Sequence, residues 1–333
     1  MVCGAGAIGM AMGGYLASAG YRVLLLTRDS HAAKIARDGL RITGAAGDLH
    51  VAVPALASAA QIQWDAEDVL LLTSKSQDTS PLLLQLSSAP RSLPVFCFQN
   101  GIRNEEWAKR EFPHVYGGLV NFSATVVGPG TVEHTRSDQL AVGRHPNSLD
   151  DTTGRVAEAL SRAGFQVTED AEVMAWKWGK LILNLNNAVY ALTDTWVERA
   201  FSLPPYRAFM AETMREGVGV TRAGGIEPRM EPGSRIDAFI ESLESAGSNH
   251  PALQGEPGGS RTYPSTWQDL SRRRSGTEVP YFNGEVVEMG FELGLPTPYN
   301  STLLELIREA VERSAAPGQY TLEDLEATVR DKT

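Results

Sequence analysis

Three glycines near the start of the chain constrain its fold more than any other feature. They stand in the stretch Gly4-Ala5-Gly6-Ala7-Ile8-Gly9, which has the spacing G-x-G-x-x-G. Met12 and Leu16 follow on one helical face, and a second apolar run covers residues 23–26. A short strand, a tight glycine turn, a helix and a buried strand within about thirty residues predict a dinucleotide-binding unit. The candidate contacts to the pyrophosphate, at the amino end of the helix, are Gly4, Gly6, Ala7, Ile8 and Gly9.

Two other interpretations of this N-terminus remain. The glycines could form a purely structural turn, and because only Met1, Val2 and Cys3 precede Gly4, either the first strand is very short or the chain begins a few residues late. The absence of charge before Arg22 is also compatible with a signal peptide. That interpretation is disfavoured because the segment lacks a basic amino end and a leucine-rich core, and its glycines would break an apolar helix.

The composition is that of an ordinary globular protein, with 333 residues, 42% hydrophobic and 21% charged. A chain of this length is expected to form two domains, each with its own core. No apolar run is long enough for a membrane helix, and a formal net charge of −10 argues against nucleic acid as a partner. Cys3 and Cys97 lie in apolar runs and the histidines are scattered. We therefore expect no metal site, and a cytoplasmic protein with buried thiols.

Strand and helix patterns alternate through residues 1–170, as in the doubly wound parallel sheet of an α/β protein. Residues 68–73 and 94–98 are predicted to be buried strands, and polar residues follow each of them. In such sheets ligands bind outside the carboxyl ends of the strands. An asparagine before a glycine is also a common turn, and a lysine after a strand is usually solvated. The candidates at the cofactor edge are Lys75, Gln77, Gln99 and Asn100.

The end of this half carries further strand signals. Residues 126–132 predict a hairpin with a Gly128-Pro129-Gly130 turn. Residues 151–163 predict a helix, and residues 165–168 a last strand. These elements complete a predicted cofactor domain of residues 1–170.

Residues 171–333 have an almost entirely helical pattern, apart from a loop rich in Gly, Pro and Ser at 247–260. Residues 175–188 are apolar nearly all round, so we expect one buried central helix there. Lys180 and Asn184 are four residues apart and lie on one face of it. An ammonium and an amide on a buried helix need partners or a polar cleft. Alternatively, the lysine extends to the surface and the asparagine bonds a neighbouring helix.

Several short motifs occur in a fixed order along the chain. They are the G-x-G-x-x-G turn, Lys75 after a strand, Asn100-Gly101, Lys180-x-x-x-Asn184, Ser265-x-x-Gln268-Asp269, Thr277-Glu278-x-x-Tyr281-x-Asn283-Gly284 and Pro296-x-Pro298-x-Asn300. Each is modest alone, but the ordered set resembles the ketopantoate reductase (2-dehydropantoate 2-reductase) family over nearly the whole chain. The final motif is similar to the turn before that family's last helix.

The resemblance implies an N-terminal Rossmann domain, an all-helical substrate domain at 171–333 and a substrate cleft between them. It also implies NADPH-dependent reduction of a 2-oxo acid to its 2-hydroxy acid. By family analogy Lys180 is the general acid. Asn100 and Asn184 hold the substrate and its reacting oxygen. Ser265 binds the carboxylate end, and Glu278 holds a substrate hydroxyl.

The sequence departs from the family pattern mainly in the substrate half. At the position of the family's second asparagine this chain has Ala188, with Asn187 just before it. At a position that is often acidic in the family it has Pro280. Losing two polar groups favours a bulkier or more apolar side chain on the substrate, unless Asn187 restores the missing contact.

Arg28 follows the second strand, where an NAD enzyme usually carries the acid that holds the ribose 2′-hydroxyl. A guanidinium suits a 2′-phosphate instead, although the adjacent Asp29 could compete. Arg28 therefore predicts NADPH as the cofactor.

Other functions share the nucleotide fold, among them dehydrogenases of opines, imines or hydroxyacyl thioesters, and a non-catalytic NADPH-binding redox sensor. The sequence indicates no histidine near a strand end or on the Lys180 helix, which argues against a histidine-based enzyme. Retention of Lys180, Asn184 and Glu278 argues against a sensor. The expected partner is thus a small 2-oxo acid, and the sequence is compatible with a homodimer.

Overall fold

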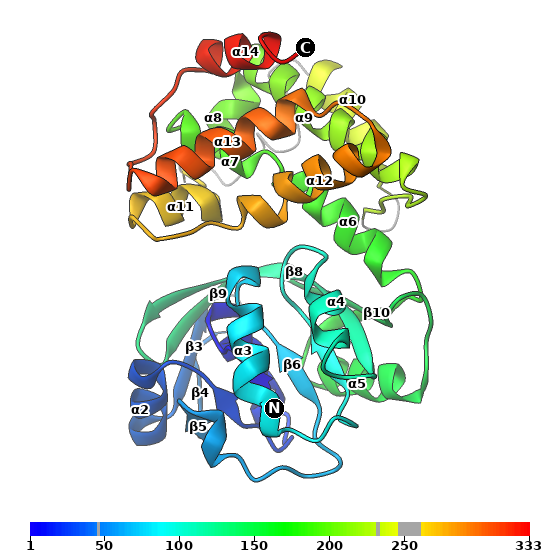
Figure 1. The fold of residues 1–333 in the computed structure, drawn as a ribbon. Helices are drawn as coiled ribbons and strands as arrows, with labels where there is room; N and C mark the ends of the chain where they lie inside the picture. The colour runs from blue at the N-terminus through cyan, green and yellow to red at the C-terminus, as the bar shows by residue number, and fades with distance from the viewer. Residues whose placement is uncertain (45–46, 231–233, 246–260) are drawn as a thin grey trace. The chain divides into compact units, whose positions relative to one another are not determined.

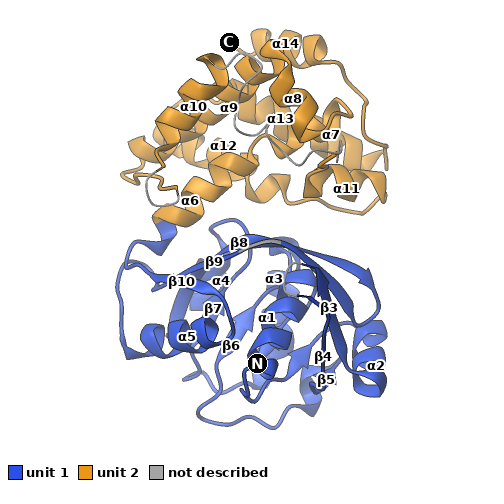
Figure 2. Ribbon diagram, turned by 180° about the vertical axis from the view of Figure 1, so that it is seen from behind, with its two compact units in different colours: residues 1–174 blue, residues 175–333 orange. Residues whose placement is uncertain are grey.

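The computed structural model describes residues 1–44, 47–230, 234–245 and 261–333 (Figure 1). The predicted loop at 247–260 lies outside these residues. The chain divides into two compact units, Met1–Met174 and Ala175–Thr333, here called unit 1 and unit 2 (Figure 2).

Unit 1 contains one sheet. Its strands are β1 (Val2–Cys3), β2 (Leu25–Leu26), β3 (Leu40–Gly44), β4 (Leu49–Val51), β5 (Ala55–Leu56), β6 (Leu70–Leu72), β7 (Val95–Cys97), β8 (Val115–Gly128), β9 (Thr131–Arg144) and β10 (Gln166–Glu169). They are ordered β4-β3-β9-β8-β7-β6-β1-β2-β5, with β10 beside β9. From β8 to β5 every neighbouring pair is parallel. This confirms the predicted α/β class.

Helices cover both faces of the sheet. They are α1 (Ala7–Ser18), α2 (Asp29–Asp38), α3 (Thr79–Gln85), α4 (Asn104–Lys109) and α5 (Asp151–Arg162). Val2 and Leu71 pack in a core with α1 and α5. The next residues along their strands, Cys3 and Leu72, pack in a second core with α3 and α4. Because successive side chains of a strand point to opposite faces, each short central strand serves both cores.

The predicted hairpin is present, with β8 and β9 joined through Pro129 and Gly130. Gly130 has a φ of +65°, which a glycine adopts without steric cost. A side chain there would also press on Lys34 of α2. The turn residues therefore bring the end of the hairpin against α2.

Unit 2 is helical in the residues that the structure describes. Its elements are α6 (Val173–Asn184), α7 (Asn187–Leu192), α8 (Val197–Ser202), α9 (Pro204–Ala223), α10 (Ile236–Ser245), α11 (Ser265–Ser271), a 3-10 helix (Val279–Tyr281), α12 (Asn283–Leu293), α13 (Pro298–Glu312) and α14 (Leu322–Arg330). The 20-residue α9 contacts α8, α10, α12, α13 and α14. The predicted all-helical second domain is confirmed in this part of the chain.

The single helix predicted over residues 175–188 is wrong, because α6 ends at Asn184 and α7 begins at Asn187. Asparagine has a weak helix propensity, and its side chain competes for hydrogen bonds of the backbone. Here the Asn186 amide donates to the Met210 carbonyl, and the Asn187 amide donates to Oδ1 of Asn184; both distances are 3.4 Å. Three asparagines in four positions thus interrupt the helix.

Two asparagines of the recognised motifs hold unit 2 together. Asn283 donates to the Leu185 carbonyl and to Oδ1 of Asn300, at 3.1 and 2.9 Å. Asn300 in turn donates to the carboxylate of Glu216 at 2.7 Å. Both asparagines are fully buried, so each needs these partners. The motif at Pro296 to Asn300 leads into α13, and α14 follows it.

Candidate active site

The ends of four neighbouring parallel strands, β7, β6, β1 and β2, are joined at one edge of the unit 1 sheet. The Thr27 hydroxyl, after β2, donates to the Ala5 carbonyl at 2.7 Å. The Thr73 hydroxyl, after β6, lies 3.3 Å from the Gly4 carbonyl. Ser76 donates to the Asn100 carbonyl at 2.7 Å. Hydroxyl residues at the strand ends therefore fix the loops where a ligand of such a sheet binds.

The glycine turn has the features that a pyrophosphate site requires. Gly4 has a φ of +76°, and a Cβ there would lie 2.7 Å from that of Ser74. A Cβ on Gly9 would overlap the Thr73 hydroxyl, so this glycine lets α1 pack against the sheet. At Gly6 the nearest atom to an added Cβ is 4.0 Å away, leaving the backbone accessible. The first-turn amides of α1, which have no partner within the helix, begin at Ala7.

Buried polar atoms gather at this edge. Among the described residues, Oγ of Ser74 and Oε1 of Gln77 and Gln99 are buried without a hydrogen-bond partner. Such atoms are costly unless a ligand or water completes them. Together with the open glycine turn, they fit a bound dinucleotide. Ser74 was not among the predicted residues, although its place directly after a strand is the signal that could have found it.

A buried hydrogen-bond network fixes the loop of Asn100. The Gln99 amide donates to the Thr79 hydroxyl at 3.1 Å, and Thr79 donates to Oδ1 of Asn104 at 2.8 Å. The Asn104 amide donates to the Asn100 carbonyl at 2.8 Å. Gln99 and Asn104 thus support the loop, whereas the Asn100 side chain is only partly buried. The sequence pattern did not indicate Asn104, because it is the first residue of α4, and an asparagine is common at a helix start without any functional role.

Arg28 and His31 lie together after β2. Arg28 follows β2, as predicted from the sequence; it is exposed and is the residue before α2. Its Nη2 lies 3.4 Å from Nε2 of the buried His31, in the first turn of α2. The expectation that no histidine lies near a strand end is therefore wrong. It failed because two polar residues separate Arg28 from His31 in the sequence, and the helical turn brings them together.

In unit 2, Lys180 lies one turn before the end of α6 and is partly buried. Burial lowers its pKa from an ordinary 10.5 to about 8. The Glu278 carboxylate acts in the opposite direction, and the Lys177 ammonium lowers the pKa further. Glu278 is itself 4% exposed, directly before the 3-10 helix at Val279. The structure thus brings these two predicted residues into electrostatic contact.

The predicted substrate residues of unit 2 fall into two groups. Asn184 and Asn187 are partly buried and bonded to each other. Ser265 is the first residue of α11, which packs against α7. Ala188, by contrast, is fully buried in the core of α7, α13 and α14. The helix interruption therefore puts Asn187 on the side of Asn184 and turns Ala188 inward.

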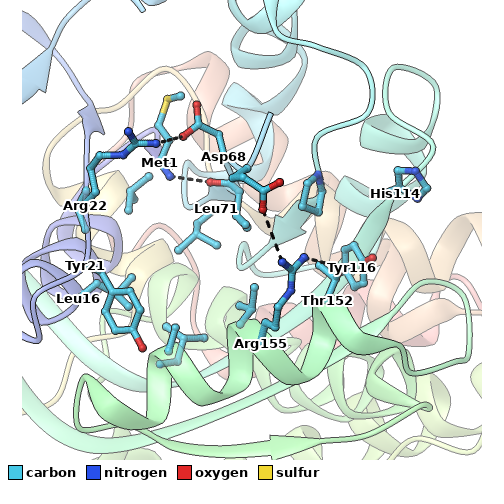
Figure 3. A pocket seen from close by; sticks show the side chains of 18 of the residues that line it. Met1, Leu16, Tyr21, Arg22, Asp68, Leu71, His114, Tyr116, Thr152 and Arg155 are labelled. Carbon is cyan, nitrogen blue, oxygen red and sulfur yellow. Dashed lines mark hydrogen bonds and ion pairs between the residues drawn. The ribbon is translucent and has the colours of Figure 1, made fainter. Parts of the chain in front are cut away.

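A cavity of about 660 Å³ in unit 1 lies elsewhere (Figure 3). Met1, Val69 and Pro94 line it, so it opens at the amino ends of β1, β6 and β7, opposite the glycine turn. Its charged groups pair with one another, as in Arg22 with Asp68 at 3.7 Å. Ligands of doubly wound sheets bind instead at the carboxyl edge, where the glycine turn lies.

Neither a membrane helix nor a metal cluster is found in the parts of the chain that the structure describes. No helix there is long and apolar enough to cross a bilayer. No group of three or more His, Cys, Asp or Glu side chains there could hold a metal ion.

Comparison with known proteins gives matches over both units. The family model described as ketopantoate reductase PanE/ApbA matches residues 1–147, and the model of its C-terminal part matches residues 172–311. The 2-dehydropantoate 2-reductase of Pyrococcus abyssi is 31% identical over 315 residues, which cover 93% of this chain and 98% of that protein.

Solved structures agree with these matches. A PanE/ApbA family ketopantoate reductase from Ralstonia eutropha has a TM-score of 0.82 and 29% identity, covering 94% of this chain and 98% of that one. A D-mandelate dehydrogenase, solved with NADH and anilino(oxo)acetate, has a TM-score of 0.81 at 23% identity, with 94% and 98% covered. At that identity the second likeness concerns the fold.

Proposed function

Because this chain belongs to the ketopantoate reductase (PanE/ApbA) family, we propose that it reduces a 2-oxo acid, 2-dehydropantoate or a related ketoacid, to the 2-hydroxy acid with NADPH. The observation that carries this proposal is the position of Lys180 on α6, partly buried and in electrostatic contact with Glu278, where burial lowers its pKa to about 8. A proton donor works best when its pKa lies near the working pH. An ordinary lysine, with a pKa of about 10.4, is too weak an acid for this task.

The chemistry requires a hydride and a proton. A bound nicotinamide supplies the hydride. As the hydride adds to the keto carbon, the carbonyl π electrons move onto oxygen, and that oxygen takes a proton from Nζ of Lys180. The lysine is left neutral and regains its proton from water. Lys177 and burial favour this proton release, while Glu278 opposes it.

Four polar residues of unit 2 are assigned to the substrate. Asn184 and Asn187 present amides that can hold the keto oxygen and a neighbouring polar group, and their mutual hydrogen bond fixes their orientation. Ser265 is assigned to the carboxylate, and Glu278 to a substrate hydroxyl. From unit 1 we assign Asn100 to the substrate and its reacting oxygen.

NADPH rather than NADH is the proposed cofactor. The support is Arg28, an exposed guanidinium at the end of β2. That position faces the adenosine ribose in dinucleotide folds, and a guanidinium binds a phosphate through paired charge-assisted hydrogen bonds. The glycine turn is assigned to the pyrophosphate, and Lys75 and Gln77 to the neighbouring cofactor edge.

The proposal is tested by adding NADPH with a panel of 2-oxo acids and following the absorbance of the reduced nicotinamide. Oxidation of NADPH by the acid alone supports it. Oxidation that requires an added amine would indicate an opine or imine dehydrogenase instead. Tight NADPH binding without oxidation by any acid would indicate the redox sensor.

The proposal includes a cytoplasmic location, which is supported by the buried thiols of Cys3 and Cys97, since such thiols persist in a reducing compartment. It also allows a homodimer, and light scattering of the purified protein measures that assembly.

A further inference from the structure

The hydrogen-bonding role of His31 is set by the backbone of the β8–β9 hairpin. Its side chain is only 4% exposed, and the Gly130 N–H donates to its Nδ1 at 3.1 Å. Nδ1 is therefore an acceptor and carries no proton. In a neutral imidazole the proton must then be on Nε2, which makes Nε2 a donor.

That donor faces the Arg28 guanidinium, whose Nη2 is 3.4 Å away. Arg28 has only donors, so the two groups cannot satisfy each other. The other neutral tautomer would place a proton on Nδ1, where it would face the Gly130 N–H. The Gly130 contact decides the tautomer, because it is shorter and comes from fixed backbone, whereas Arg28 is exposed and can move. Burial and the Arg28 charge also lower the pKa of His31, which favours its neutral form.

Two converging donors, one charged and one neutral and buried, suit a shared anionic acceptor. The amino end of the ten-residue α2, which begins at Asp29, adds a favourable dipole for an anion. We propose that Nε2–H of His31 and the guanidinium of Arg28 together bind the 2′-phosphate of NADPH, which makes His31 a determinant of cofactor specificity. This inference rests on the proposed NADPH function. A neutral donor adds a directed hydrogen bond there without repelling Arg28.

The test measures binding of NADP⁺ and NAD⁺, which differ only in the 2′-phosphate, by calorimetry without substrate. We expect His31→Ala to weaken NADP⁺ on the order of tenfold, the usual effect of losing one hydrogen bond to a charged group, and to leave NAD⁺ unchanged. His31→Gln should restore most of the NADP⁺ affinity, because its amide can accept from Gly130 and donate to the phosphate.

Arg28→Ala separates this inference from the proposal on which it rests. If Arg28→Ala weakens both cofactors equally, the assignment of Arg28 to the 2′-phosphate fails. If Arg28→Ala selectively weakens NADP⁺ while His31→Ala weakens both cofactors equally, or neither, only the role of His31 is overturned. A His31→Gln variant that behaves like His31→Ala also overturns the role of Nε2 as the donor.

Discussion

Lys180 combines partial burial with two neighbouring charges of opposite effect, and its pKa of about 8 sets a pH dependence. Reduction needs the protonated lysine, so we expect kcat/KM to be constant below about pH 8 and to fall about tenfold per pH unit above it. The reverse oxidation needs the neutral lysine and should rise with pH up to about 8. Initial rates in both directions between pH 6 and 10 measure this.

Glu278 provides the control for this assignment. Its carboxylate raises the pKa of Lys180, so Glu278→Gln should move the pH at which reduction declines to a lower value. The comparison uses the position of the decline rather than the rate, because Glu278 is also assigned to the substrate. A decline that stays in place, or moves to higher pH, would mean that another group governs the profile.

Arg28 determines cofactor choice in this account. Removing hydrogen bonds to a charged group costs about 1.5–3 kcal/mol. Arg28→Ala should therefore weaken NADPH binding about 10- to 100-fold and NADH binding much less. Fluorescence titration of each reduced cofactor gives both values, and equal losses for both would exclude Arg28 as the discriminating residue.

At the scale of elements, the packing of α1 on the sheet depends on Gly9. A Cβ there would overlap the Thr73 hydroxyl and lie 3.0 Å from Val2. We expect Gly9→Ala to destabilise the protein by about 1–3 kcal/mol, the usual cost of overpacking. Gly219→Ala in α9 is the matched control, because nothing lies within 4 Å of its Cβ. That change should be neutral or stabilising by up to about 1 kcal/mol, and thermal unfolding that shows equal effects would refute the packing role of Gly9.

The interruption between α6 and α7 bears on substrate choice. It buries Ala188 in the core and leaves Asn187 bonded to Asn184. In the proposed site, the Asn187 amide is therefore both the partner of Asn184 and the polar group assigned to the substrate. Pro280, two residues after Glu278 and partly buried, supplies no polar group to the proposed substrate site. A site with fewer hydrogen-bonding groups tolerates apolar ligands better than polyhydroxylated ones.

We therefore predict that 2-dehydropantoate is reduced weakly, or no better than 2-oxo acids with bulkier or more apolar side chains. The measurement is kcat/KM over a panel of branched and aromatic 2-oxo acids. If 2-dehydropantoate far exceeds every other acid, Asn187 replaces the family's asparagine fully. Asn187→Ala should then reduce kcat/KM for 2-dehydropantoate more than for the apolar acids.

At the scale of the whole molecule, the fold could be predicted from the pattern of apolar residues and from the glycine and proline residues at turns. Gly4, Gly6 and Gly9 indicated the first turn, and the apolar runs around residues 70 and 95 indicated the neighbouring strands β6 and β7. These features are local, since a strand's pattern reflects its own burial. The Gly-Pro-Gly turn likewise indicated the hairpin.

Features that depend on contacts between distant residues could not be predicted. The helix break at Asn184 needed knowledge of where the asparagine side chains find partners, such as the Met210 carbonyl. His31 gained its role from Gly130, 99 positions away along the chain. The lowered pKa of Lys180 follows from burial, and the Glu278 carboxylate that limits this lowering is brought near only by folding.

In the proposed reaction, residues of unit 1 bind the cofactor and Lys180 of unit 2 supplies the proton. The most direct test is the turnover of Lys180→Ala with saturating NADPH and the 2-oxo acid that the panel ranks first. We predict that kcat falls on the order of 10²–10⁴-fold, as for loss of a positioned acid, while the Kd of NADPH changes little. Lys332→Ala, which removes an exposed ion pair with Glu305 in the same unit, should leave kcat unchanged. Near-normal turnover by Lys180→Ala would contradict the account, because the proton would then come from another group.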